Sequence, residues 1–415
     1  PSFVHTVPKN YILKNVSARS TPVMIKLYMY AQQQHIAADL TCDVLATYKS
    51  QSGEPRIANH TIQLPLFLAC MLRPPIKSAA FKFTLETGND PIPLTELYDD
   101  VIFALKESGQ NVSDVVGNTE AQAMGFQTWV TNHLGTPATI SILESKTGGR
   151  YRVQSDSLPA LYLFTSQLEK RLNTYMAANI NDKDKMAGKL VADNVSRIKC
   201  SDAMPLETYF DEISSHFDIR KKLQENYSDL NDTAHLFRII QKRLLTRFKD
   251  RNATALGGLD IVMRETYQNI LRLSDITQEA QHELIKRQHS IGCISKLLVQ
   301  LTGMRLSMTA SDRNLLETYF CPDLPSSTGS GGDGLEGVGW EEAVELSLTY
   351  LLKTALSKNP KITTKANTSP VQMPENVDSL RKMISLVFVK LEEGKSMTVT
   401  EQRSVDNNIE SSTKK

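Results

Sequence analysis

The sequence has little of what a secreted or membrane-spanning protein needs. Its five cysteines are an odd number, lie far apart and form no CxxC pair, which argues against a disulfide framework and predicts an intracellular chain. Its longest strongly apolar stretch, residues 62–72, contains Pro65 and falls well short of the roughly 20 residues of a transmembrane helix. A charge excess is also missing, because 47 basic side chains face 46 acidic ones. No global field would therefore attract nucleic acid or an anionic membrane.

The motifs that carry common enzyme chemistry are absent too. There is no Walker phosphate loop, GxGxxG turn, GxSxG elbow, HExxH pair, EF-hand loop or zinc-binding cysteine spacing. His282, His289 and Cys293 fall on one face of a helix at 100° per residue. A single metal can bridge His289 and Cys293, but His282 lies about 10 Å further along the axis. A packing or interface stripe is therefore favoured over a metal site, and we expect no catalytic residue, cofactor or metal.

What the chain does contain begins with β-structure over residues 1–75. Apolar and polar residues alternate from Val23 to Tyr30 and again from Leu40 to Tyr48, so each run predicts a strand with one buried face. Short strands separated by turn-forming residues favour an antiparallel, immunoglobulin-like sandwich. Because the chain starts at Pro1 without a methionine or a leader, we expect a fragment of a longer protein.

Residues 76–203 mix strand and helix patterns and predict a second domain of α/β type. Phe81 to Leu85 alternate as a strand, and apolar residues from Leu158 to Met176 follow a helical period. The clearest local signal is the segment 146–149, whose two glycines can take the positive φ of a tight turn. A β-hairpin is therefore predicted between residues 138–144 and 150–154.

Residues 204–320 predict two long antiparallel helices, a helical hairpin. Apolar residues recur at three-to-four spacing on both sides of an interruption at Gly257 and Gly258. Such a pair buries little by itself, so part of its surface is expected to be an interface. The candidate partner interface comprises an apolar stripe, two basic residues on its rim, and an aromatic residue further along: Phe237, Ile240, Leu244 and Phe248; Arg238 and Lys242; Trp340.

The remainder of the chain is predicted to be a linker, two helices and a tail. Residues 321–339 include a stretch rich in glycine and serine, a composition typical of a flexible tether. Residues 340–394 carry two amphipathic helices, with Trp340 as an anchor for the first. Residues 395–415 are expected to be disordered.

Four motifs in order resemble a known family. They are Arg150-Tyr151-Arg152-x-Gln154-Ser155; Pro205-Leu206-x-x-Tyr209-Phe210 with His216-Phe217 and Arg220; Arg243-Leu244-Leu245-x-Arg247-Phe248-Lys249-Asp250; and Gly339-Trp340-Glu341-Glu342 with Leu351-Leu352-Lys353-Thr354. Together they look like the C-terminal half of the Bardet-Biedl syndrome 9 protein family. The resemblance fades after about residue 394.

The resemblance implies a layout of ear domain, α/β platform, long helical hairpin and C-terminal helices, in which the ear domain lacks its start. It also implies a non-enzymatic scaffold subunit of the BBSome, a coat-like complex that carries membrane proteins to and from primary cilia. The implied partners are other BBSome subunits, among them β-propeller and tetratricopeptide-repeat subunits, and indirectly ciliary membrane cargo and the membrane surface. The implied locations are the cytoplasm and the cilium, at its membrane, basal body or centriolar satellites.

An alternative function would use a different surface of the chain. In it the chain is a vesicle-coat appendage that captures short peptide motifs through its platform domain. A concave pocket lined by aromatic residues such as Phe126 and Trp129 is then expected to bind the peptide. In the scaffold reading the helical hairpin binds folded subunits instead.

Overall fold

A computed structural model describes most of the chain. The described residues are 4–7, 12, 26, 28–31, 39–50, 52–107, 123–131, 137–145, 148–178, 198–249, 258–322, 339–356, 373–374 and 376–394. By its internal contacts the chain forms two compact units, residues 1–205 with 292–321, and residues 206–291 with 322–415. Among the described helices, none combines the length and the apolar character required to cross a bilayer.

The N-terminal part of the first unit consists of antiparallel β-ribbons. Strand β1 (Val4–Val7) pairs with β2 (Tyr28–Ala31), and β3 (Thr41–Lys49) pairs with β4 (Pro55–Gln63). The strand predicted around residues 40–48 is therefore present. The buried face predicted for it was wrong, because Val44 is 37% and Tyr48 52% exposed. In the described part of this region the β3–β4 pair carries no second sheet, and a two-stranded ribbon alone covers neither of its faces.

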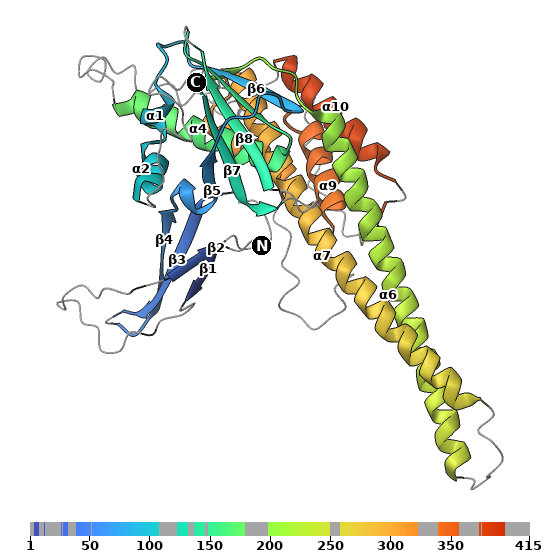
Figure 1. The fold of residues 1–415 in the computed structure, drawn as a ribbon. Coiled ribbons are helices and arrows are strands. Elements are labelled where there is room, and N and C mark those ends of the chain that lie inside the picture. Colours follow the sequence, from blue (N-terminus) through green and yellow to red (C-terminus); the bar gives the residue numbers. More distant parts are fainter. Residues whose placement is uncertain are drawn as a thin grey trace, which may run out of the picture. The chain divides into compact units, whose positions relative to one another are not determined.

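The platform of the first unit is a six-stranded antiparallel sheet with the order β10-β6-β9-β8-β7-β5. Its strands are β5 (Cys70–Arg73), β6 (Phe81–Glu86), β7 (Ala123–Thr131), β8 (Pro137–Glu144), β9 (Arg150–Ser155) and β10 (Lys199–Cys200). The short helices around it are η1 (Leu66–Leu68), α1 (Leu94–Leu97) and α2 (Asp99–Glu107). A longer helix, α4 (Leu158–Ala178), lies against strands β8 and β9 (Figure 1).

The predicted β-hairpin is confirmed as β8 and β9. Glu144 pairs with Tyr151 at the turn, and Ile140 pairs with Ser155 at the far end. Gly148 and Gly149 have φ angles of 84° and 52°, in the region that glycine enters without steric cost. At Gly149 a Cβ atom would also collide with the carbonyl oxygen of Asn89, so both backbone conformation and space select glycine there.

Three aromatic side chains pack together in the core of the platform. Phe126 is 1% exposed and lies between Tyr98 and Phe164, with ring centroids 5.1 and 4.9 Å away.

Residues 70–73, which the sequence assigned to the N-terminal sandwich, form β5 and pair with β7 at the edge of the platform sheet. Alternation alone could not assign them, because a strand pattern does not specify which sheet supplies the partner strand.

The first unit also includes helical residues from the C-terminal half of the chain. The last part of helix α7 (Leu259–Arg305) and helix α8 (Ala310–Phe320) belong to it. Glu169 of α4 ties both to the platform, because it accepts hydrogen bonds from Gln300 at 2.6 Å and Arg313 at 2.7 Å. The compact units therefore divide the residues 204–320 that the sequence grouped as one hairpin domain.

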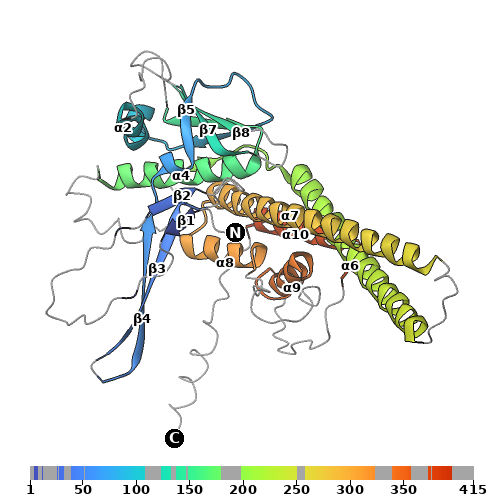
Figure 2. The same cartoon turned by 60° about the horizontal axis from the view of Figure 1, so that its bottom comes forward.

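The second unit is built from long helices. Helix α6 (Leu206–Lys249) and helix α7 run side by side as a helical hairpin, as Figures 1 and 2 show from two directions. Two shorter helices, α9 (Trp340–Lys353) and α10 (Asp378–Glu392), pack on each other. All four helices were predicted. Of the linker expected at 321–339, residues 323–338 lie outside the described residues, and Gly339 is the residue that precedes α9. The expected tail at 395–415 also lies outside the described residues.

Candidate interaction surfaces

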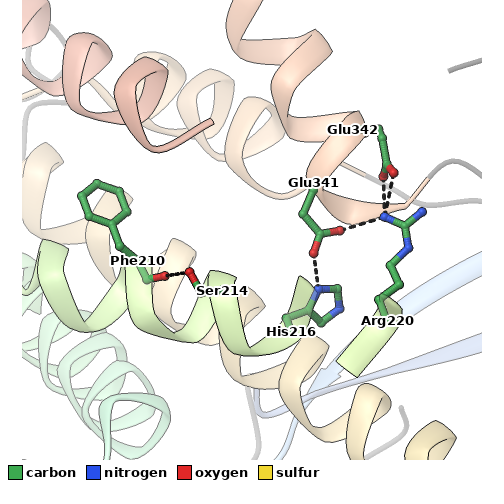
Figure 3. Close-up of polar contacts among 6 residues, drawn as sticks. All are labelled: Phe210, Ser214, His216, Arg220, Glu341 and Glu342. Atoms are coloured by element: carbon green, nitrogen blue, oxygen red, sulfur yellow. Dashed lines mark hydrogen bonds and ion pairs between the residues drawn. The ribbon is translucent and has the colours of Figure 1, made fainter. Parts of the chain in front are cut away.

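A buried polar cluster of the second unit joins the first half of α6 to the start of α9. His216 Nδ1 lies 2.6 Å from Glu341 Oε1, and Arg220 Nη1 lies 3.0 Å from the other oxygen of the same carboxylate. Arg220 Nη1 also donates to both oxygens of Glu342, at 2.8 and 2.6 Å. Figure 3 shows the four side chains converging between the two helices. We call this cluster, His216, Arg220, Glu341 and Glu342, the junction.

The carboxylates of the junction are buried, so their negative charges need nearby positive charges. The side chains of Glu341 and Glu342 are only 1% and 3% exposed. Burial by itself would raise the pKa of Glu341, but the hydrogen bond and charge of His216, together with the charge of Arg220, outweigh it and lower that pKa. Burial works against the charge of Arg220 as well, and the Glu342 and Glu341 carboxylates more than offset it, so the pKa of Arg220 is raised. The junction holds its charges only as a set.

The residues that flank the junction explain the motif Gly339-Trp340-Glu341-Glu342. A Cβ atom on Gly339 would overlap the guanidinium of Arg220, so the absence of a side chain there makes room for the ion pairs. The ring of Trp340 meets the ring of His216 edge-on, with centroids 6.4 Å apart. Trp340 is 5% exposed, so it anchors α9 as predicted and does not offer its ring to a partner surface.

Helix α10 is held to the same stretch of α6. Arg381 donates from Nη2 to the backbone carbonyl oxygen of Phe210 at 3.1 Å and also contacts the Ser214 hydroxyl. Ser214 in turn donates to the Phe210 carbonyl at 2.9 Å, as Figure 3 shows. The first half of α6 is therefore the common base for both C-terminal helices.

The far part of the hairpin, residues 236–248 of α6 and 261–273 of α7, is packed differently; we call it the shaft. Ile240 and Leu244 are 5% and 7% exposed and share one stripe of α6 with Phe237. Phe237 meets Tyr267 of α7 at 6.0 Å between ring centroids, which places this stripe in the seam between the helices. Thr266 of α7 is buried, and its hydroxyl donates a hydrogen bond to the Val262 carbonyl oxygen at 2.7 Å.

The other predicted interface residues of the shaft lie at its surface. Arg238 and Lys242 are exposed, in line with a position on a rim. Phe248 shares the helical stripe of Leu244 but is 66% exposed, beyond the part of the seam that shields Leu244. Whether any of the six α6 residues touches a partner stays a prediction.

Sequence reasoning missed a second apolar set on the shaft. Leu245 is 62% exposed, Tyr267 50% and Leu271 49%. Helical geometry puts Leu245 and Phe248 on the flank of α6 that carries Phe237, and puts Tyr267 and Leu271 on the corresponding flank of α7. We call Leu245, Phe248, Tyr267 and Leu271 the outer stripe. The i, i+3 and i, i+4 spacings were readable in the sequence, but the seam stripe masked them because it is longer.

His282, His289 and Cys293, the residues considered for a metal site, all lie on α7. Cys293 is 1% exposed, and its burial raises the pKa of its thiol to about 12. His282 is exposed. Within the described ranges no three His, Cys, Asp or Glu side chains are grouped closely enough to hold a metal ion.

The domains identify the class of protein. Four domain models match successive stretches of the chain: a GAE domain at residues 1–62, a platform domain at 65–189, a hairpin at 203–306 and a C-terminal helix bundle at 308–391. The chain thus has the appendage-like multidomain architecture that the sequence predicted, in the same order. Such an architecture is that of a scaffold or adaptor.

All four models describe domains of PTHB1, and the chain belongs to the PTHB1 family. It is 31% identical to Protein PTHB1 of Mus musculus over 380 residues, covering 90% of this chain and 38% of the mouse protein. It is 29% identical to Protein PTHB1 of Homo sapiens over 375 residues, with 89% and 38% covered. The Caenorhabditis elegans protein pthb1 homolog is 19% identical over 228 residues, with 55% and 25% covered.

Two facts follow from these matches. The family name taken from the motifs, Bardet-Biedl syndrome 9 protein, is corrected, because the matching relatives and models carry the name PTHB1. The chain also spans well under half the length of its mammalian relatives, 38% of each.

Proposed function

We propose that this chain is a non-enzymatic scaffold region of a BBSome subunit, and that it works through protein–protein interfaces. The observation that carries the proposal is the contrast along α6, whose base is locked to α9 and α10 while its shaft exposes apolar side chains. At 1.5 Å per residue the 44 residues of α6 extend over about 66 Å. A helix of that length, fixed at one end, presents its far end to other subunits.

The shaft is suited to a partner because its outer stripe is only half-covered. The four residues spread along the hairpin over roughly 20 Å when the Phe237–Tyr267 contact sets the register of the two helices. Exposed apolar residues aligned in this way are typical of protein interaction sites, whereas single exposed residues are ordinary. The exposed cations Arg238 and Lys242 lie nearby and would form the polar rim of such an interface.

The proposed partners are other BBSome subunits, including those with β-propellers or tetratricopeptide repeats. Contact with ciliary membrane cargo and the membrane surface is then indirect, through the assembled complex, and nucleic acid is not a partner. The proposed setting is the cytoplasm and the cilium, at its membrane, basal body or centriolar satellites. The near-zero net charge of +1 fits a protein that meets other proteins rather than a polyanion.

The direct test is co-purification of this chain with individual BBSome subunits. Wild-type protein is expected to retain at least one of them through size-exclusion chromatography, and Leu245→Asp with Phe248→Asp is expected to release it. The matched control places the same two charges at exposed polar positions outside the stripe, with Asn231→Asp and Gln268→Asp. Retention by the stripe variant, or failure of the wild type to hold any subunit, contradicts the proposal.

The alternative function, peptide capture by the platform, was predicted to use a surface pocket lined by Phe126 and Trp129. Phe126 lies in the aromatic core of the platform and cannot line a surface cleft. The side chain of Trp129 lies outside the described residues.

A further inference from the structure

The platform holds a cavity of about 750 Å³ whose lining does not include Phe126. Its walls come from the segment that leads into η1, from α1 and the start of α2, and from α4. The residues that line it include Leu64, Leu66, Glu96, Leu97, Gln167 and Arg171. The volume lies within the range of natural ligand sites, roughly 300–1,000 Å³.

The floor of the cavity is apolar and firmly placed. Leu64, Leu66 and Leu97 are 5%, 1% and 5% exposed, so the surrounding packing fixes them. One wall is rigid as well, because Arg171 makes two hydrogen bonds to the Asp100 carboxylate, at 2.6 and 2.8 Å, and a third to the Leu97 carbonyl. The Arg171 guanidinium also stacks over the ring of Tyr98 at 4.7 Å. The cavity is therefore a formed recess with a fixed floor.

One wall of the cavity carries a side-chain carboxamide. The Gln167 side chain is 7% exposed and lines the cavity. It offers an N–H donor and a carbonyl acceptor side by side, which is the complement of a peptide unit. Gln167, Lys170, Arg171 and Thr174 follow a helical period, so one face of α4 forms this wall.

The charges at the mouth do not cancel. Arg171 is neutralised by Asp100, and Lys170 lies 3.6 Å from Asp39. Glu96 accepts a hydrogen bond from the hydroxyl of Tyr175 at 3.1 Å and has no cation within ion-pair distance among the described side chains. An unbalanced carboxylate at the mouth favours a ligand that carries a positive charge.

We propose that this cavity binds a short extended peptide in which an apolar side chain stands next to a lysine or arginine. The apolar side chain enters the recess over Leu64, Leu66 and Leu97, the peptide unit pairs with the Gln167 carboxamide, and the cation meets Glu96. A water molecule satisfies the carboxamide but leaves the apolar floor uncovered, whereas a peptide does both. The site goes beyond the scaffold role and does not depend on it.

The test uses two blocked tetrapeptides, acetyl-Gly-Leu-Lys-Gly-amide and acetyl-Gly-Leu-Glu-Gly-amide, titrated into the whole chain with labelled leucine methyl groups. The lysine peptide is expected to shift the Leu66 and Leu97 methyl resonances and to bind about threefold tighter than the glutamate peptide, the scale of one exposed ion pair. Gln167→Met, which keeps the volume and removes the amide, is expected to weaken binding at least tenfold. Glu96→Gln is expected to abolish the preference between the peptides.

Two further variants keep the test decisive. Thr174→Phe is expected to fill the cavity from its rim and block both peptides, while Asn173→Ala, exposed on the neighbouring position of α4, is expected to bind as wild type. Leucine methyl spectra away from the cavity report whether each variant is folded. Failure of both peptides to shift Leu66 and Leu97, or equal binding by Gln167→Met and wild type, overturns the proposal. Subunit co-purification is unaffected by either result.

Discussion

The two ends of helix α6 show two ways of using the same residue types. Near its start, Tyr209, Ile213 and His216 are at most 3% exposed, and two further helices cover that stretch. In the shaft, Ile240 and Leu244 are buried while Leu245 and Phe248 are more than 60% exposed. Both stretches have apolar residues at helical spacing. The difference is whether this chain supplies the covering surface, and it separates residues that build the fold from residues left available to other molecules.

The comparison also shows where the family motifs act. His216 and Arg220 belong to one motif and Glu341 and Glu342 to another, more than a hundred positions later, and they meet as one ion cluster. The third of the four motifs begins in the shaft, where it contributes Leu244 to the seam and Leu245 and Phe248 to the surface. A single motif thus mixes both purposes.

The largest expected effect is loss of a junction carboxylate. Glu341→Ala leaves the buried His216 without its carboxylate partner and takes one of two carboxylates from Arg220. Breaking a buried pair in this way costs about 3–5 kcal/mol. We expect urea denaturation to show that loss, with α9 released first in limited proteolysis. Glu345→Ala is the control. Among the described residues its side chain accepts a single hydrogen bond, from the exposed Ser379 hydroxyl at 3.1 Å, so its loss is expected to cost little. Equal stability of the two variants contradicts the junction's structural importance.

Truncation in the seam comes next. Leu244→Ala removes a side chain that is 7% exposed and is expected to destabilise the chain by about 2–3 kcal/mol. Its neighbour Leu245 is 62% exposed, so Leu245→Ala is expected to stay within about 0.5 kcal/mol of wild type. Thermal unfolding of both variants checks the difference. A larger loss from Leu245→Ala would reverse the assignment of seam and outer stripe.

A smaller effect is expected at Gly339. The added methyl group of Gly339→Ala must displace the Arg220 guanidinium, and such overpacking costs about 1–3 kcal/mol. Combining it with Arg220→Ala removes the obstacle, so the double variant is expected to be less destabilised than the sum of the single variants. Chemical denaturation of all three provides the cycle. Additive losses would mean that Gly339 and Arg220 do not compete for the same space.

The mildest test is acidity. Because the pKa of Glu341 is lowered in the folded chain, its contribution to stability is fully present above its unfolded value and is lost as the pH falls through the lowered folded value. We expect the free energy of unfolding to decline in that acidic window, and Glu341→Gln to flatten the decline. Unfolding followed from pH 7 downward measures both curves. Parallel curves for the two proteins would show that this carboxylate is not the group that titrates.

The elements of the fold were largely predictable because their signals are local. The glycines 148–149 specify a β-hairpin turn through φ, and the apolar period of residues 206–249 specifies a helix, with no information from elsewhere in the chain. The transfer of residues 70–73 to the platform sheet was not predictable, since pairing of Cys70 with Thr128 joins segments far apart in the sequence.

The sites were predicted only in part for the same reason. Periodicity selected Ile240 and Leu244 as one stripe with Phe248, but exposure depends on how far the facing helix extends, and that separates Phe248 from the other two. Trp340 was assigned to a partner surface although His216, distant in the sequence, covers it. The cavity beside Gln167 has no sequence signal at all, because its walls come from segments that are distant in the sequence and meet only in the fold.

The central claim, that the junction serves the fold and the shaft serves binding, is tested most directly by hydrogen–deuterium exchange on this chain with and without bound BBSome subunits. We predict that bound subunits slow exchange in peptides covering residues 236–248 and 261–273, and leave exchange unchanged at 209–220 and 340–348. Protection confined to the junction peptides, with the shaft exchanging as in the free chain, would contradict the account.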